Sequence, residues 1–128
     1  MNLTISTVTV DCSDAERLAR FWAAALGWDV APNASAEFAA VGGPRRPPDS
    51  PSLVFVRVPE AKTAKNRWHL DLEADDPEAA VTRLVSLGAS VVRRVSEDGA
   101  SWIVLTDPET NEFCVALPHS LADDPATS

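Results

Sequence analysis

The feature that most constrains the fold of this chain is a pattern that occurs twice. In each half, a strand rich in β-branched residues precedes an amphipathic helix, and three strand-like segments follow the helix. The two helices end in the same pair, Leu26-Gly27 and Leu87-Gly88. Two copies of about 60 residues are too few for a solenoid. The sequence therefore predicts an α+β fold of two tandem βαβββ modules, each with a helix on one face of its sheet.

Helix signals and alternating segments give the expected boundaries of the elements. Ser13, with Glu16 three residues later, is typical of a capped helix start. Asp75 or Asp76 caps the second helix, and Pro77 suits its first turn. The segments expected to be strands are residues 3–12, 28–31, 36–42 and 52–58 in the first module and residues 67–74, 89–95, 101–106 and 112–117 in the second.

Length, charge and cysteine content narrow the class of protein. With 128 residues, we expect one domain over residues 1–120, made of modules 3–59 and 66–118, and a flexible tail over residues 119–128. The net charge of −8 disfavours nucleic acid and anionic membranes as partners. The sequence shows no secretory signal, no apolar run long enough to span a membrane, and too few cysteines for a disulfide scaffold. We therefore expect a cytoplasmic protein.

Strand alternation predicts which side chains face away from the helices. In the strand at residues 67–73, the apolar residues expected to pack on the helix are Trp68, Leu70 and Leu72. The polar residues on the opposite face are Arg67, His69, Asp71 and Glu73. Applied to both modules, this alternation predicts a concave face with polar groups among apolar ones, which suits a small-molecule site. The residues predicted to line it are Thr7, Thr9, Phe55, Arg57, Arg67, His69, Asp71, Trp102 and Cys114.

These residue types allow chemical roles and structural ones. His69 and Asp71 can form a general acid–base pair, or His69 can be a structural histidine. Cys114 can be a nucleophile or a metal ligand, or a small core residue. Arg57 and Arg67 can bind a carboxylate on a ligand, or they can form ion pairs with acidic residues of the chain.

Three segments carry a family resemblance that covers residues 3–117. They are Val8-Thr9-Val10-Asp11-Cys12-Ser13-Asp14 with the helix that ends in Leu26-Gly27-Trp28, then Lys65-Asn66-Arg67-Trp68-His69-Leu70-Asp71-Leu72, then Asp107-Pro108-Glu109-Thr110-Asn111-Glu112-Phe113-Cys114-Val115. In this order they resemble the small glyoxalase-like branch of the glyoxalase/bleomycin resistance/dioxygenase superfamily, which has the vicinal oxygen chelate fold. In the last segment, Thr110 stands where the family pattern has glycine.

The resemblance implies a curved, eight-stranded mixed sheet around a cavity, often completed in a homodimer. It also implies that metal-dependent members bind a divalent ion at positions that match Thr7, Phe55, His69 and Cys114. Threonine is a poor ligand and phenylalanine is none, and the remaining two residues are too few for a stable zinc site. We therefore expect no metal and no other cofactor.

Three functions are compatible with these residues. The first is a metal-independent lyase or isomerase, in which His69 moves a proton with the help of Asp71. The second is a protein that binds a small molecule without chemistry, as the drug-sequestering members of the superfamily do. The third is a divalent-metal lyase or dioxygenase that uses His69, Cys114 and further ligands.

Overall fold

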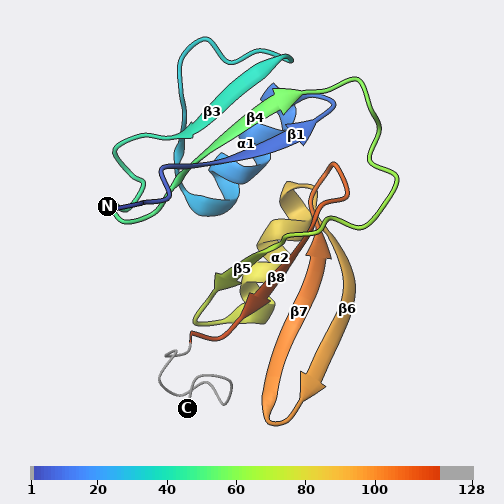
Figure 1. The fold of residues 1–128 in the computed structure, drawn as a ribbon. Helices are drawn as coiled ribbons and strands as arrows, with labels where there is room; N and C mark the ends of the chain where they lie inside the picture. Colours follow the sequence, from blue (N-terminus) through green and yellow to red (C-terminus); the bar gives the residue numbers. More distant parts are fainter. Residues whose placement is uncertain (1, 119–128) are drawn as a thin grey trace. The chain divides into compact units, whose positions relative to one another are not determined.

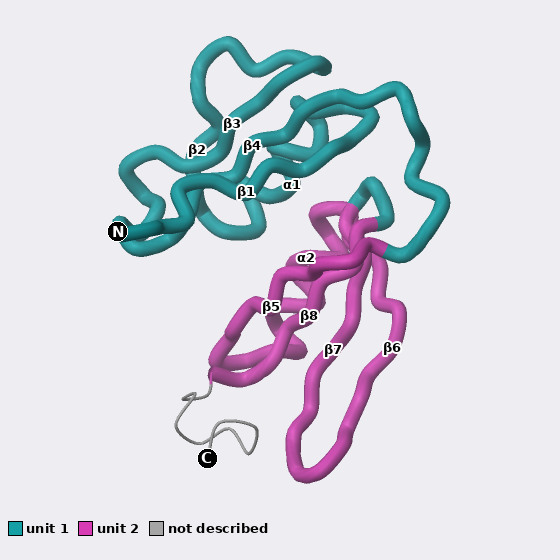
Figure 2. The backbone as a smooth tube through the Cα atoms, viewed as in Figure 1, with its two compact units in different colours: residues 1–65, 108–110 teal, residues 66–107, 111–128 magenta. Residues whose placement is uncertain are grey.

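The computed structural model describes residues 2–118, so the tail predicted over residues 119–128 lies outside the described part. The element order is βαβββ twice (Figure 1), which confirms the predicted class and the two modules. The chain forms two compact units (Figure 2). Of the described residues, the first unit contains 2–65 together with the turn Pro108–Thr110, and the second contains Asn66–Asp107 and 111–118.

The first unit is a four-stranded sheet with one helix. Its elements are β1 (Thr7–Cys12), α1 (Ala15–Leu26), β2 (Asp29–Val30), β3 (Phe38–Gly42) and β4 (Ser52–Arg57). The strand order is β1-β4-β3-β2, with β1 and β4 parallel and the other pairs antiparallel. The helix α1 lies against one face of the sheet (Figure 1), and its buried side chains Leu18, Phe21 and Trp22 form the core with that face.

The second unit repeats this arrangement. Its elements are β5 (Leu70–Glu73), α2 (Pro77–Leu87), β6 (Ser90–Glu97), β7 (Ala100–Thr106) and β8 (Glu112–Ala116). The order is β5-β8-β7-β6, again with the first pair parallel and the others antiparallel. The eight expected strands are thus all present, and their hydrogen bonds join them in two sheets of four with the same topology. This identity of topology is what a duplicated sequence predicts.

The first helix starts one residue later than predicted. Its N-cap is Asp14, whose side chain accepts a hydrogen bond from the backbone N–H of Arg17. Ser13 has another partner, because both its backbone N–H and its hydroxyl donate to the carboxylate of Glu109. The helix ends as expected at Gly27, which has a left-handed φ of 72°.

The second helix starts where the sequence predicts. The side chain of Asp76 accepts a hydrogen bond from the backbone N–H of Ala79, and Pro77 occupies the first turn. Val81 and Leu84 are buried against the sheet. Among the described residues, no helix is long and apolar enough to cross a membrane.

The strand predicted over residues 67–74 is shorter at its beginning. It starts at Leu70, and Trp68 is 85% exposed, so the expectation that Trp68 packs on the helix is wrong. The side chain of Asn66 explains the late start. Its amide donates to the carbonyls of Trp68 and Glu112, and its oxygen accepts from the N–H of Glu112. This side chain therefore takes the backbone groups of β8 that a longer β5 would need.

The edge strand β6 contains a β-bulge. The pairing with β7 advances by one residue while β6 passes from Val91 to Arg93, so Val92 is an extra residue in the ladder. In a regular strand, Arg93 would share the face of Val91. Because of the bulge it lies on the opposite face, and Arg94 lies on the face toward α2.

Candidate functional site

Three chemically reactive side chains meet on the face of the second sheet that is turned away from α2. Asp71 and Cys114 are directly paired residues of β5 and β8. His69 lies just before β5, with its Nε2 3.3 Å from Oδ1 of Asp71. One ligand atom from each of the three lies within 4.8 Å of the others. We call this side of the sheet the His69 face. It includes His69, Asp71, Arg93, Trp102, Val104 and Cys114.

His69 and Asp71 are accessible enough to meet a ligand. The imidazole is 45% exposed and the carboxylate 75% exposed. Two residues separated by one position in a regular strand point to the same face without close contact. Here the contact forms because His69 precedes the strand and is free of its ladder. The predicted pairing of the two side chains is thus present in space, and it allows Asp71 to orient the imidazole ring.

Cys114, unlike His69 and Asp71, is almost fully buried. The residue is 9% exposed, and burial raises the pKa of its thiol, with a further increase from the carboxylate of Asp71. The positive charge of Arg93 acts in the opposite direction and lowers this pKa. A thiol with a raised pKa is protonated at neutral pH, which makes Cys114 a poor nucleophile in the absence of a bound cation.

Trp102 and Arg93 continue the His69 face across β7 and β6. Trp102 is partly buried and is paired with Ala116 of β8, so it has the same strand parity as Val104, the partner of Cys114. Arg93 is exposed and is paired with Val104. Simple strand alternation puts Arg93 on the other face, so it was not among the predicted site residues.

The first unit does not present the predicted set. Thr7 and Thr9 are exposed on the face turned away from α1, as expected, and the Thr7 hydroxyl lies 3.0 Å from that of Ser52. Phe55, however, is 0% exposed and is paired with Ala39 in the row that packs on α1. Its predicted position on the concave face is wrong. The parallel partner of Thr9 is Val54, so Val54 is the counterpart of Cys114.

The two arginines proposed as carboxylate clamps have different surroundings. Arg57 forms an exposed ion pair with Glu37, at 3.6 Å between Nη1 and Oε1. It also shares the strand parity of Phe55, so it does not join Thr7 and Thr9 on their face. Arg67 is exposed in the bend before β5, two residues from His69.

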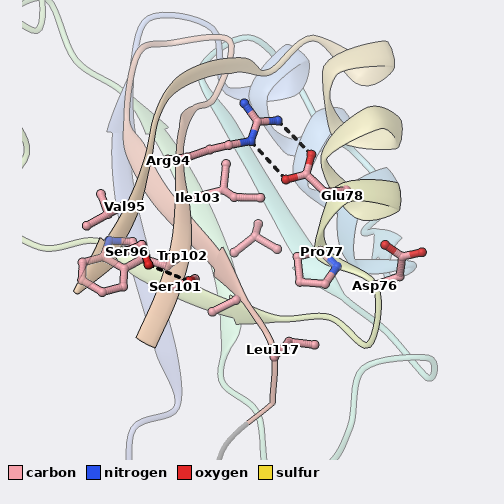
Figure 3. Close-up of a pocket in the computed structure, with 12 residues that line it drawn as sticks. Asp76, Pro77, Glu78, Arg94, Val95, Ser96, Ser101, Trp102, Ile103 and Leu117 are labelled. Atoms are coloured by element: carbon pink, nitrogen blue, oxygen red, sulfur yellow. Dashed lines mark hydrogen bonds and ion pairs between the residues drawn. The ribbon is translucent and has the colours of Figure 1, made fainter. Parts of the chain in front are cut away.

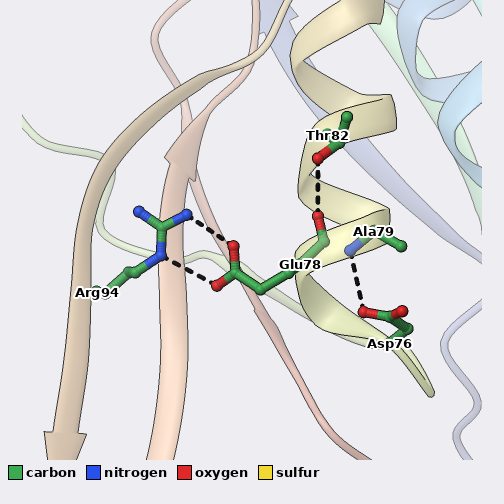
Figure 4. Close-up of polar contacts among 5 residues, drawn as sticks. All are labelled: Asp76, Glu78, Ala79, Thr82 and Arg94. Atoms are coloured by element: carbon green, nitrogen blue, oxygen red, sulfur yellow. Dashed lines mark hydrogen bonds and ion pairs between the residues drawn. The ribbon is translucent and has the colours of Figure 1, made fainter.

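A pocket of about 390 Å³ lies within the second unit and shares Trp102 with the His69 face (Figure 3). Its lining residues are Asp76, Pro77, Glu78, Arg94, Val95, Ser96, Ser101, Trp102, Ile103, Val115, Ala116 and Leu117. Among its lining residues, the guanidinium of Arg94 donates to both carboxylate oxygens of Glu78, at 2.8 and 3.0 Å (Figure 4). This pair neutralises the charge of Arg94, so that side chain is not available to a second anion.

The His69, Asp71 and Cys114 cluster fits a metal ion chemically. Imidazole nitrogen, carboxylate oxygen and thiolate sulfur are the ligands that zinc takes, at about 2.0–2.3 Å each. Ligand atoms within 4.8 Å of one another are close to the spacing that one ion requires. Asp71 supplies the third ligand that sequence analysis lacked. In the first unit, Thr7 and Val54 hold the positions that match His69 and Cys114.

The comparisons with known proteins identify the family of the chain. The chain belongs to the glyoxalase-like domain family, whose sequence profile matches residues 7–116. The family resemblance inferred from the three motifs is therefore confirmed. No curated protein matches the sequence significantly.

Solved structures show the same fold. A fosfomycin resistance protein from Mesorhizobium loti is similar with a TM-score of 0.70 and 14% identity, covering 96% of this chain and 98% of that one. A glyoxalase/bleomycin resistance protein/dioxygenase family enzyme from Burkholderia phytofirmans PsJN gives 0.68 and 20%, covering 88% and 97%. The bleomycin-binding protein of Streptomyces verticillus, in complex with copper(II)-bleomycin, gives 0.61 and 15%, covering 93% and 99%. At such identities the likeness defines the vicinal oxygen chelate fold and not an activity.

Proposed function

We propose that the chain binds a small organic molecule on the His69 face and catalyses a proton transfer there. The observation that carries the proposal is the 3.3 Å contact between His69 Nε2 and Asp71 Oδ1. When Nε2–H donates to Asp71, the lone pair of the imidazole is on Nδ1, which can take a proton from a bound molecule. Asp71 stabilises the imidazolium that results. Isomerisation, dehydration and lyase reactions all require such a step.

The experiment measures deuterium uptake from D₂O at carbon acids, because uptake reports proton abstraction before any product forms. A panel of small 2-hydroxy and 2-oxo acids, aldehydes and ketones is followed by proton NMR. General acid–base catalysis contributes about 10²–10⁴-fold in rate. His69→Ala should therefore lose at least about a hundredfold in exchange rate, and Asp71→Asn should lose less.

The matched control is Glu73→Gln, a carboxylate two residues further along β5 with the same strand parity as Asp71. It should keep the wild-type exchange rate. If His69→Ala exchanges as fast as the wild type, the acid–base proposal is wrong. A compound that binds and is recovered without exchange would support the second candidate, a binding protein without chemistry. Thr7 and Val54, which match His69 and Cys114, favour that candidate, because neither is a good metal ligand.

A divalent-metal enzyme is a third candidate, favoured by the ligand atoms of His69, Asp71 and Cys114 within 4.8 Å of one another. A bound ion would supply Lewis-acid chemistry on a ligand oxygen. The test is elemental analysis of protein purified without chelator and after soaking with zinc, nickel, iron or manganese. About one equivalent that is lost in Cys114→Ser and kept in Cys12→Ser, the cysteine of the other unit, would support it. No retained metal would exclude this candidate.

The resemblance also supports a homodimer, which we include in the proposal. Light scattering on the eluting protein should then give about twice the 13.7 kDa of one chain.

A further inference from the structure

The neighbouring residues Arg93 and Arg94 have opposite surroundings. Arg94 is bound by both carboxylate oxygens of Glu78. Among the described residues, the side chain of Arg93 makes no hydrogen bond and no ion pair. The bulge at Val92 causes this division, because it turns Arg93 to the His69 face and Arg94 to the face of α2. Bulges that re-aim one side chain are frequent beside active sites.

A single row of paired residues connects Arg93 to the reactive cluster. Arg93 is paired with Val104, Val104 with Cys114, and Cys114 with Asp71. All of them therefore lie on one face. Neighbouring strands are about 4.8 Å apart, so the backbones of Arg93 and Cys114 are about 10 Å apart. The effect of Arg93 on the pKa of the Cys114 thiol is in keeping with this placement.

The side chains between Arg93 and the reactive cluster are apolar. Val104, directly opposite Arg93, is 2% exposed, and Trp102 is the next residue of β7 on the same face. No carboxylate is paired with Arg93 or with Val104. The row thus has a cation at one end, buried apolar side chains in the middle with the partly buried Trp102 beside them, and His69 with Asp71 at the other end.

We infer that Arg93 binds the anionic group, a carboxylate or a phosphonate, of a small molecule whose reactive part lies at His69 and Asp71. The inference rests on the proposed function, and it adds the class of ligand: an acid with an apolar body between its charged group and its reacting atom. The guanidinium binds such oxyanions through two parallel hydrogen bonds. Neither Arg57 nor Arg67, the arginines named from the sequence, is part of this row.

The experiment is an NMR titration of the full chain labelled with ¹⁵N, with benzoate, phenylphosphonate and the neutral benzyl alcohol as probes. Both anions should bind more tightly than the alcohol and shift the amide signals of Arg93, Val104 and Cys114. Arg93→Gln should weaken the anions by about tenfold or more, the usual effect of losing hydrogen bonds to a charged group, and leave the alcohol unchanged. Arg93→Lys should restore part of the affinity.

Arg94→Gln is the matched control, because it removes the same charge from the adjacent position on the opposite face. It should not change the affinity for either anion. If Arg93→Gln and Arg94→Gln behave alike, or if the alcohol binds as tightly as benzoate, the inference is overturned. Anion binding that depends on Arg93 without deuterium exchange would retain the anion site and reject the acid–base function. If charged substrates exchange deuterium as fast in Arg93→Gln as in the wild type, the acid–base function stands and the anion site is rejected.

Discussion

At the scale of single residues, the two phenylalanines of the first sheet make a matched pair. Phe55 is 0% exposed in the row that packs on α1, whereas Phe38 is 51% exposed on β3. Truncating a fully buried phenylalanine removes its transfer free energy and leaves a cavity. Phe55→Ala should therefore lower the free energy of unfolding by about 3–5 kcal/mol, and Phe38→Ala by much less. Denaturant unfolding measures both; equal losses would contradict the assignment of Phe55 to the core.

The wrong prediction for Phe55 has a simple physical cause. The side-chain period of a strand is two, so an alignment that is wrong by one residue moves every side chain to the other face. Both closing strands end in a valine followed three residues later by a proline, Val56-Arg57-Val58-Pro59 and Val115-Ala116-Leu117-Pro118. Aligning these ends puts Phe55 opposite Cys114, one residue from its structural counterpart Val54. His69 and Asp71 were found because their strand alternates clearly between polar and apolar residues. Their contact depends on Asn66, whose role cannot be seen in a pattern of alternation.

At the scale of elements, the turn between β7 and β8 holds a strained residue. Thr110 has a φ of 68°, at the position where the family pattern has glycine. The left-handed conformation costs an L-residue about 1–2 kcal/mol, and glycine gives back about 0.5–1 kcal/mol through its greater freedom in the unfolded chain. Thr110→Gly should therefore raise the free energy of unfolding by up to about 1 kcal/mol, as measured by denaturant unfolding.

The control for this change is Asn33→Gly, at another left-handed residue with a φ of 69°. Asparagine tolerates that region far better than a β-branched residue does. Its replacement should give a smaller gain or none. A loss of stability in Thr110→Gly would show that the hydrogen bond from its hydroxyl to the Glu109 carbonyl outweighs the strain.

The start of a helix was predictable where a single local capping signal sets it, and not where a distant residue binds the same capping group. Asp76 and Pro77 have no rival partners, so the start of α2 follows from sequence. At α1, Ser13 is diverted by Glu109, a residue 96 positions away, which no local signal contains. At the bulge, the run Val91-Val92-Arg93-Arg94 breaks the alternation of apolar and polar residues, and this break is the local signal that could have indicated it.

At the scale of the whole molecule, the duplication made the fold class predictable. Two copies of the same periodicity support each other, so an error of a few residues in one strand does not change the topology. The functional site does not tolerate such an error. It consists of a few side chains whose faces are set by strand register, and a shift of one residue moves each of them to the other face.

Each unit also contains one bidentate or near-bidentate ion pair that links stability to pH. Arg45 lowers the pKa of Asp29 in the first unit, mainly by hydrogen bonding, and Arg94 lowers the pKa of Glu78 in the second in the same way. A carboxyl whose pKa is lowered by folding stabilises the native state above its ordinary pKa. That contribution is lost as the pH falls through the lowered pKa, when the native carboxylate takes up its proton.

The double variant Arg45→Gln/Arg94→Gln removes both shifts. Between about pH 5 and pH 2, the midpoint of thermal unfolding should therefore fall further in the wild type than in the variant. The difference should be small, since both pairs are exposed to solvent, and added salt should reduce it further. Parallel curves for the two proteins at low salt would show that these pairs make no net contribution, and that the acid sensitivity of the chain arises from its other carboxylates.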